Sequence, residues 1–261
     1  MNISNNAAMS ISSMLKNTII TKLDAYKPET VQMPFHNRLL GKDRYELFSF
    51  IQSMNTTFGI SIWEQVAVIL AKEAGRNAER QKILAGQVDS STDELITRLV
   101  HDLREGKARA DKEEESEIIK KSIMSAQSRP EDSDRVVDFA MFVNNRMELY
   151  DITSAKPNMK EFASLKTKLL RWTALSYSQD RNHEVFTAIA IPYNPYLPKP
   201  YDRWTMRGLF DLERNEVMVG EEFWNHVGGG EIYDELLDIF QATGEELGEI
   251  IDKKFSEFRL R

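Results

Sequence analysis

The stretch that decides the fold runs over residues 135–160 and reads RVVDFAMFVNNRMELYDITSAKPNMK. Residues 135–143 are rich in Val, Phe and Met, which is typical of a β-strand. Residues 144–146, Asn-Asn-Arg, supply a turn, and residues 147–155 have the composition of a second strand. The stretch therefore predicts a β-hairpin.

A helix and another strand are predicted directly after this hairpin. Pro157 ends the second strand, and Asn158 is a good N-cap for a helix that continues to about Ser178. Residues 184–191 form a continuous apolar run, which indicates a buried central strand. A loop rich in Pro and Tyr follows over residues 192–201, and a short strand is expected near residues 216–219, with helices from Glu221 onward.

The first 130 residues, in contrast, are predicted to be helical. Apolar residues recur there at helical spacing in four segments, residues 11–26, 45–54, 58–71 and 95–103. Residues 111–121 form a charged helix, which we interpret as a solvent-exposed face without a site. The expected fold is α/β, a small central mixed β-sheet flanked by helices, with a helical N-terminal part. Residues 1–130 would contribute one core helix, and residues 131–261 would form the core with the C-terminal helices, together in one compact domain.

The composition excludes several classes of protein. The chain of 261 residues contains no cysteine, so a disulfide, a thiolate metal site and a cysteine nucleophile are excluded. No apolar run approaches the ~20 residues that span a bilayer. Residues 1–14 lack the basic and apolar regions of a signal peptide. We therefore expect a cytoplasmic protein.

The charge is unevenly distributed along the chain, whose formal net charge is −7. Residues 156–207 contain nine Lys and Arg and four Asp and Glu, a local balance of +5. Residues 208–261 contain five and fourteen, a balance of −9. Because phosphate attraction is a local field effect, this basic middle is compatible with a positive cleft in an acidic protein. A solvated helix face with a basic loop explains the same numbers.

One acid and one lysine in the hairpin suggest a chemistry. Asp138 lies in the middle of the first predicted strand, and Ser154 and Lys156 are two residues apart in the second, so they share a face. Hydrolysis of a phosphodiester with Mg²⁺ needs carboxylate ligands and benefits from a cationic group beside the attacking water. The hairpin would bring Asp138 and Lys156 together for this purpose.

The segment Asp138…Ser154-Ala155-Lys156 resembles the D…(D/E/S/T)-x-K signature of the PD-(D/E)XK nuclease superfamily. Further blocks resemble the TdeIII family of type II restriction endonucleases; they lie at residues 58–64 (FGISIWE), 155–162 (AKPNMKEF), 191–196 (IPYNPY), 203–206 (RWTM) and 219–224 (VGEEFW). The superfamily signature alone is weak, whereas the ordered blocks are more specific. The resemblance implies a restriction-endonuclease-like fold and a Mg²⁺-dependent site-specific deoxyribonuclease.

The sequence departs from the superfamily pattern at Ser154, which occupies the place of the second metal-binding acid. Glu64 and Glu161 are the candidates to replace it, and both alternatives stay open. Asp151 is disfavoured because an odd number of residues separates it from Lys156. Glu148 is disfavoured because it lies roughly 20 Å away along the strand. In this hypothesis Asp138, one of the two glutamates and the Ala155 carbonyl bind Mg²⁺, and Lys156 stabilises the transition state.

The loop at residues 192–201 and the segment after it offer candidates for DNA binding, namely Lys199, Arg203, Trp204 and Arg207. Arginine can pair with guanine in the major groove. The resemblance implies a palindromic target of the GGNCC kind, and therefore a homodimer. It also implies a cognate DNA methyltransferase in the same system, without a stable complex.

Two alternative functions remain at this point. The first is another nuclease of the same superfamily, of a repair type, which would leave unmodified plasmid uncut. The second is a non-enzymatic DNA-binding or interaction module in which Asp138 and Lys156 form only a salt bridge. In that case substitution of Lys156 would affect stability and no Mg²⁺-dependent activity.

Overall fold

The computed structural model describes residues 2–26, 33–123, 133–206 and 208–259. Its centre is a five-stranded mixed sheet with the order β1-β2-β3-β4-β5. β1 pairs with β2 and β2 with β3 in antiparallel orientation, whereas β3 pairs with β4 and β4 with β5 in parallel. The strands are β1 (Asn77–Ile83), β2 (Val136–Val143), β3 (Arg146–Ile152), β4 (Glu184–Ile191) and β5 (Val217–Val219). This arrangement confirms the expected mixed sheet.

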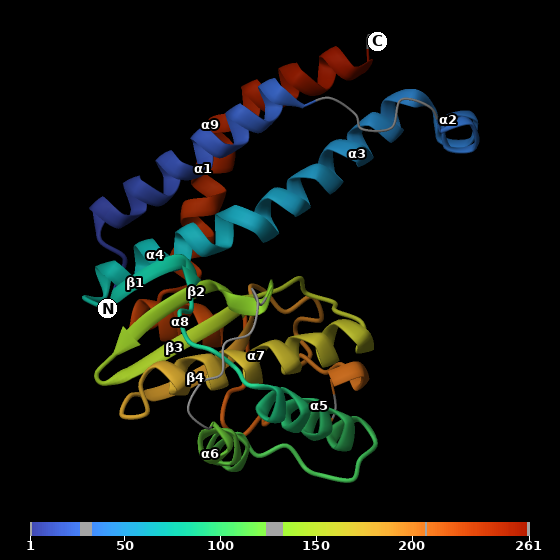
Figure 1. Cartoon of the computed structure of the whole chain (residues 1–261). Coiled ribbons are helices and arrows are strands. Elements are labelled where there is room, and N and C mark those ends of the chain that lie inside the picture. The colour runs from blue at the N-terminus through green and yellow to red at the C-terminus, as the bar shows by residue number, and fades with distance from the viewer. Residues whose placement is uncertain (1, 27–32, 124–132, 207, 260–261) are drawn as a thin grey trace.

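Helices cover both faces of the sheet (Figure 1). One face is covered by α5 (Ser90–Arg104), α6 (Lys112–Ser122) and α7 (Met159–Gln179). The other face is covered by α1 (Asn5–Ala25), α4 (Trp63–Glu73), α8 (Glu221–Gly228) and α9 (Tyr233–Arg259). The remaining helical segments are α2 (Pro34–Leu40), α3 (Lys42–Thr57), the π-helical η1 (Phe58–Ile62) and the 3₁₀ turns η2 (Ser133–Arg135) and η3 (Trp204–Met206). The fold is therefore an α/β sandwich.

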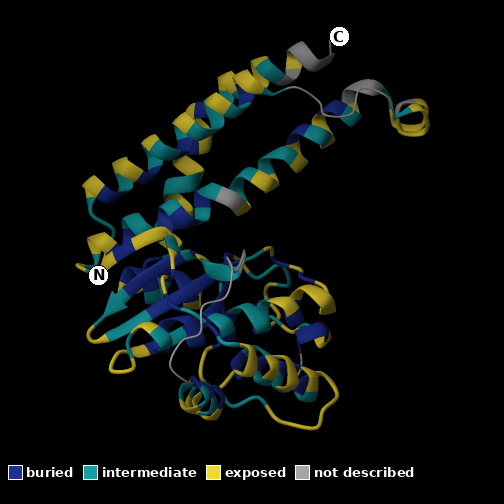
Figure 2. Ribbon diagram, viewed as in Figure 1, coloured by how far each residue is buried: buried dark blue, intermediate teal, exposed yellow. Residues whose placement is uncertain are grey.

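The two faces of the sheet bury separate apolar clusters, seen as the dark blue centre of Figure 2. Trp172 of α7 is completely buried in the first cluster, and Trp224 of α8 is almost completely buried in the second. Burying side chains of this size contributes ~2–3 kcal/mol each. No helix within the described ranges has the length and apolar character needed to span a bilayer.

Several predicted elements are confirmed. The hairpin forms around a turn at residues 144–145, and the strand predicted at 184–191 is β4. Asn158 caps α7 by accepting hydrogen bonds from the backbone of Lys160 and Glu161. α1, α3, α4 and α5 correspond to the four segments with helical spacing, and α8 and α9 to the helices expected after Glu221.

Other predictions about the fold are wrong. β1 lies in the part predicted to be helical, because its sequence NAERQKI is polar and an exposed edge strand shows no apolar alternation. β3 ends at Ile152, three residues before the predicted end of that strand. The charged helix α6 is not only an exposed face, since Lys112 and Glu115 are buried. The domain boundary expected between residues 130 and 131 lies outside the described residues.

Candidate active site

The strands β2 and β3 separate at one end, and two aspartates lie at this opening. Their antiparallel pairing ends at Phe139 and Tyr150, and one more step of the same register would place Asp138 opposite Asp151. The backbone N–H of Ile152 donates a hydrogen bond of 3.0 Å to Asp138 Oδ2, which holds the Asp138 carboxylate against β3. Because residues opposite each other in a sheet share a face, the two carboxylates lie close together.

Lys168 of α7 supplies the cation at this opening. Its ammonium forms an ion pair with Asp151 and lies 4.9 Å from the centre of the Trp172 ring. Burial by itself would lower the pKa of Lys168, but the carboxylates of Asp151 and Asp138 outweigh burial and raise it. Lys168 is therefore held in its charged form next to both aspartates.

Glu64 approaches from α4 and is 2 % exposed. Its Oε1 accepts a hydrogen bond of 2.7 Å from Gln81 Nε2, and Arg80 Nε lies 3.1 Å from Oε2. Gln81 has a φ of +50°, an uncommon value for a residue with a side chain. Burial raises the pKa of Glu64, and the negative charge of Asp151 adds to this effect. Helices from both faces of the sheet thus supply side chains to the opening.

The pKa of Asp138 reflects both burial and the charges around it. Burial, together with the negative charges of Asp151 and Glu64, raises this pKa to about 7 against the opposing effects of Lys168 and of the hydrogen bond from the Ile152 backbone. Three carboxylates therefore surround the two cationic groups of Lys168 and Arg80. Strongly perturbed carboxylates of this kind are typical of functional sites.

The residues predicted from the D…S-x-K pattern are less closely associated. Since β3 ends at Ile152, Ser154 and Lys156 lie in the following loop, and both are exposed. The Lys156 ammonium lies 5.4 Å from the centre of the Tyr196 ring. The Ala155 carbonyl accepts a hydrogen bond of 3.0 Å from the Tyr201 hydroxyl. The described residues contain no ion pair between Asp138 and Lys156.

The structure separates the two candidate glutamates. Glu64 belongs to the cluster with Asp138, as described above. Glu161 instead accepts a hydrogen bond of 2.6 Å from the backbone N–H of Asn158 and completes the capping box of α7. This hydrogen bond turns the Glu161 carboxylate back toward the helix N-terminus and away from the cluster around Asp138.

The argument that set Asp151 aside is also wrong, because it assumed that β3 continues to Lys156. The sequence contains a better signal, since residues 138 and 151 are equally distant from the turn at Asn144-Asn145. Lys168 was missed altogether, and nothing in its local sequence distinguishes it from other helix lysines. Glu148, also set aside, is buried and holds Tyr150, Arg146 and His226 together by hydrogen bonds.

The predicted DNA-binding residues have different environments. Trp204 is 69 % exposed, and Lys199 is exposed as well. Arg203 instead donates to the Tyr196 hydroxyl (3.0 Å) and to the Pro157 carbonyl (2.8 Å), so it holds two loops together. Arg207 lies outside the described residues.

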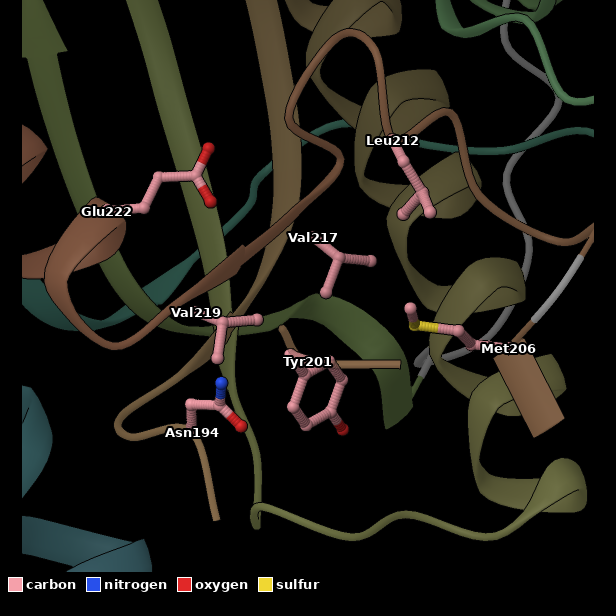
Figure 3. Close-up of a pocket in the computed structure, with 7 residues that line it drawn as sticks. All are labelled: Asn194, Tyr201, Met206, Leu212, Val217, Val219 and Glu222. Carbon is pink, nitrogen blue, oxygen red and sulfur yellow. The ribbon is translucent and has the colours of Figure 1, made fainter. Parts of the chain in front are cut away.

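A hollow of about 310 Å³ lies beside β5 and next to the Pro/Tyr loop (Figure 3). Its lining is mostly apolar, with contributions from Val217, Val219 and Met206. Glu222 is the one acid among the lining residues, and burial raises its pKa. Because a single carboxylate is a poor site for a divalent cation, this hollow is a weaker candidate than the cluster around Asp138.

The donor set around Asp138 fits a hard divalent cation in its chemistry. Carboxylate oxygens are the ligands that Mg²⁺ prefers, and a cation would offset both the burial and the charge repulsion that raise the pKa of Asp138. Within the described part of the chain, no three acidic or histidine side chains are already arranged around a common metal position. Binding a cation at this position would therefore require these side chains to move.

The fold and this site define a class of protein, the α/β enzymes with a restriction-endonuclease-like fold. Comparison with known proteins specifies it further: a family model described as "Type II restriction endonuclease, HinfI" matches residues 3–244. The chain therefore belongs to the HinfI family of type II restriction endonucleases. The TdeIII family, in contrast, stays a prediction.

Three curated relatives support this assignment. The type II restriction enzyme HgiCII of Herpetosiphon aurantiacus is 25% identical over 224 residues, which cover 85% of this chain and 81% of that enzyme. HgiEI of the same organism is 24% identical over 237 residues, with 85% and 82% covered. HgiBI is 24% identical over 222 residues, with 81% and 77% covered. No solved structure matches the chain significantly.

Proposed function

We propose that this protein is a Mg²⁺-dependent type II restriction endonuclease that hydrolyses double-stranded DNA at a short palindromic site. We place its active site at Asp138, Asp151, Lys168 and Glu64. The observation that carries the proposal is the excess of carboxylates at the opening between β2 and β3, with Lys168 ion-paired beside them. Membership of the HinfI family supports a restriction enzyme over a repair nuclease or a binding module.

Asp138 and Asp151 are the proposed metal ligands, and Glu64 is the third acid in reach of the same charge cluster. Bound Mg²⁺ would supply Lewis-acid stabilisation of the phosphoryl oxygens and a more acidic water. Asp138 has to lose its proton first, which the raised pKa of about 7 allows at neutral to alkaline pH.

Lys168 takes the role that the sequence pattern assigned to Lys156. Its ammonium is fixed by Asp151 and kept charged, so it can stabilise negative charge that grows on the phosphate during attack by water. A fixed cation of this kind lowers the barrier because its orientation is established before the reaction. Lys156, which is exposed and lies over Tyr196, has no comparable position.

Recognition of DNA requires further groups. We propose that the exposed side chains of Trp204 and Lys199 contact DNA from the Pro/Tyr loop. A palindromic target, of the GGNCC kind that the sequence blocks imply, requires two copies of the chain related by a twofold axis. A cytoplasmic location and a separate methyltransferase that protects the host DNA belong to the same proposal.

The test is incubation of the purified protein with unmodified phage DNA and Mg²⁺, followed by sequencing of the fragment ends. We expect discrete fragments whose ends share one short palindrome, and no cutting in the presence of EDTA. Absence of discrete fragments with every divalent cation tried would defeat the proposed function. If the fragment ends shared a palindrome other than GGNCC, the proposed recognition sequence would be wrong and the proposed activity would stand.

A further inference from the structure

We propose that a hollow between α5 and α7 binds backbone phosphates of the DNA that flanks the cleaved bond. The inference rests on the proposed function and extends it to a part of the molecule outside the active site. The hollow has a volume of about 390 Å³, and the two helices that form it lie side by side on the same face of the sheet (Figure 1).

The surface of this hollow is mostly apolar, but its polar groups suit an anion. His101 and Arg104 of α5 and Lys160 of α7 contribute nitrogen donors, and Ser164 contributes a hydroxyl. No acidic residue is among the lining residues. These four side chains are exposed, and none of them has a hydrogen-bond or ion-pair partner within the described part of the chain. Phosphate oxygens would satisfy these donors.

Lys160 is placed where the helix itself disfavours it. It lies in the first turn of α7, close to the positive end of the helix dipole, where a cation is unfavourable. Asn158 and Glu161 already satisfy the backbone at this end, so Lys160 is not required as a cap. His101 and Arg104 lie in the last turn of α5, where the dipole alone accounts for them. Lys160 therefore distinguishes a phosphate site from ordinary helix ends.

The hollow is also correctly placed along α7. Ser164 lines it and lies one helical turn from Lys168, whereas Lys160 lies two turns further toward the N-terminus than Lys168. Lys168 lies eight positions after Lys160, which corresponds to about 12 Å along the helix axis. This length equals the axial rise of three to four nucleotides of one DNA strand. A strand whose scissile phosphate lies at Lys168 can thus place flanking phosphates at the hollow.

The experiment compares two double variants with equal loss of charge. Arg104→Gln/Lys160→Gln removes both cations of the hollow. Arg109→Gln/Lys121→Gln removes two exposed cations that do not line it and that pair with Glu213 and Glu117. Steady-state cleavage and fluorescence anisotropy are measured on duplexes with the same central site and either two or eight flanking base pairs, between 50 and 200 mM KCl.

We expect the wild type and the control variant to bind the long duplex better than the short one. The Arg104→Gln/Lys160→Gln variant should lose most of this gain, with KM affected more than kcat. Its slope of log affinity against log salt should be shallower by about 1.8, because each phosphate contact contributes about 0.9. Over the fourfold salt range this is about a tenfold smaller loss of affinity. Thermal unfolding verifies that the variants are folded.

Equal behaviour of the two double variants on both duplexes would overturn the inference and leave the proposed function intact. The inference is also overturned if the Arg104→Gln/Lys160→Gln variant keeps the wild-type dependence on flank length while inorganic phosphate raises the unfolding temperature of the wild type but not of this variant. The hollow would then bind a free anion and not DNA. A wild type that binds DNA with flank dependence but never cuts it would defeat the proposed function, and the anisotropy data would still test the hollow.

Discussion

Two lysines of α7, separated by a single residue, lie in regions that differ in their balance of acidic and basic side chains. Lys166 is completely buried and donates to Glu115 (2.6 Å) and to both carboxylate oxygens of Glu216 (2.8 Å each). Lys168 has a side chain that is 25% exposed and pairs with Asp151 at the opening of the sheet. Both lysines contact acids, but only around Lys166 do the numbers of cationic and anionic side chains balance.

The region around Lys166 contains as many cations as anions. Lys112 joins Lys166 as the second cation and donates to Thr187 (2.7 Å) and Glu216 (3.2 Å), so two lysines face two glutamates. Burial by itself would raise the pKa of Glu216, but Lys112 and Lys166 outweigh burial and lower it. A buried network of this kind is a structural connection between α6, α7 and the start of β5.

The region around Lys168 contains three acids, Asp138, Asp151 and Glu64, against the two cations Lys168 and Arg80. Burial and, after it, the charges of Asp151 and Glu64 raise the pKa of Asp138 to about 7. The two regions thus differ in the number of compensating cations and not in the burial of their charges, and an incompletely compensated cluster is the better candidate for a functional site.

The largest expected effect is a loss of stability on removing a cation from the balanced region around Lys166. Lys166→Met should lower the free energy of unfolding by about 3–5 kcal/mol, because Glu216 and Glu115 would remain buried with less compensation. Urea denaturation measures this change. Lys121→Met, which removes an exposed lysine paired with Glu117, is the control and should cost less than about 0.5 kcal/mol. A loss of stability at Lys168→Met larger than at Lys166→Met would reverse the comparison.

The next effect concerns catalysis at the unbalanced region. Lys168→Met should reduce kcat for DNA cleavage by about 10²–10³-fold, because a positioned cation would be lost from the transition state. Lys156→Met is the matched control, and we expect its kcat to change by no more than a few-fold. Single-turnover cleavage of a plasmid with one site measures both. If Lys156→Met proved the inactive variant, the loop lysine of the sequence pattern would be the catalytic one.

A smaller effect follows from the raised pKa of Asp138. Between its ordinary value of 3.8 and about 7, the folded protein keeps a proton that the unfolded chain has lost, so stability without metal falls as pH rises through this window. The contribution is at most about 1.4 kcal/mol per pH unit. The fall of stability with rising pH should be smaller in the Asp138→Asn variant. It should also be smaller for the wild type when Mg²⁺ is present. Parallel stability curves for both proteins would show that Asp138 carries no such shift.

The smallest effect distinguishes the two glutamates. Glu161→Ala should lower stability by about 0.5–1 kcal/mol, because the capping box of α7 loses one hydrogen bond. The rate of cleavage by the folded protein should stay within about twofold. Glu64→Gln should reduce cleavage much more strongly, and comparing the two rates is the measurement. A more than tenfold slower but fully folded Glu161→Ala variant would return Glu161 to the active site.

Much of the fold follows from local features of the sequence. The apolar runs define β2 and β4, the Asn-Asn turn defines the hairpin, and Asn158 defines the start of α7. The site was only partly predictable for the same reason. Asp138 and Glu64 stand out in the sequence as acids within apolar surroundings. The end of β3 could not be predicted from the sequence, because residues 153–155 were expected to continue the strand but have no partner on the β2 side.

The sequence by itself determined the hairpin, the helix that follows it, the buried strand after that helix and the acid Asp138. Only the tertiary structure decided that Asp151 faces Asp138 and that Lys168, not Lys156, forms the ion pair with Asp151. It also decided that residues 77–83 form β1, the edge strand of the sheet. The physical reason is that hydrogen bonds within a turn or a cap join residues close in sequence. Ion pairs between a strand and a helix depend on how the whole helix packs against the sheet.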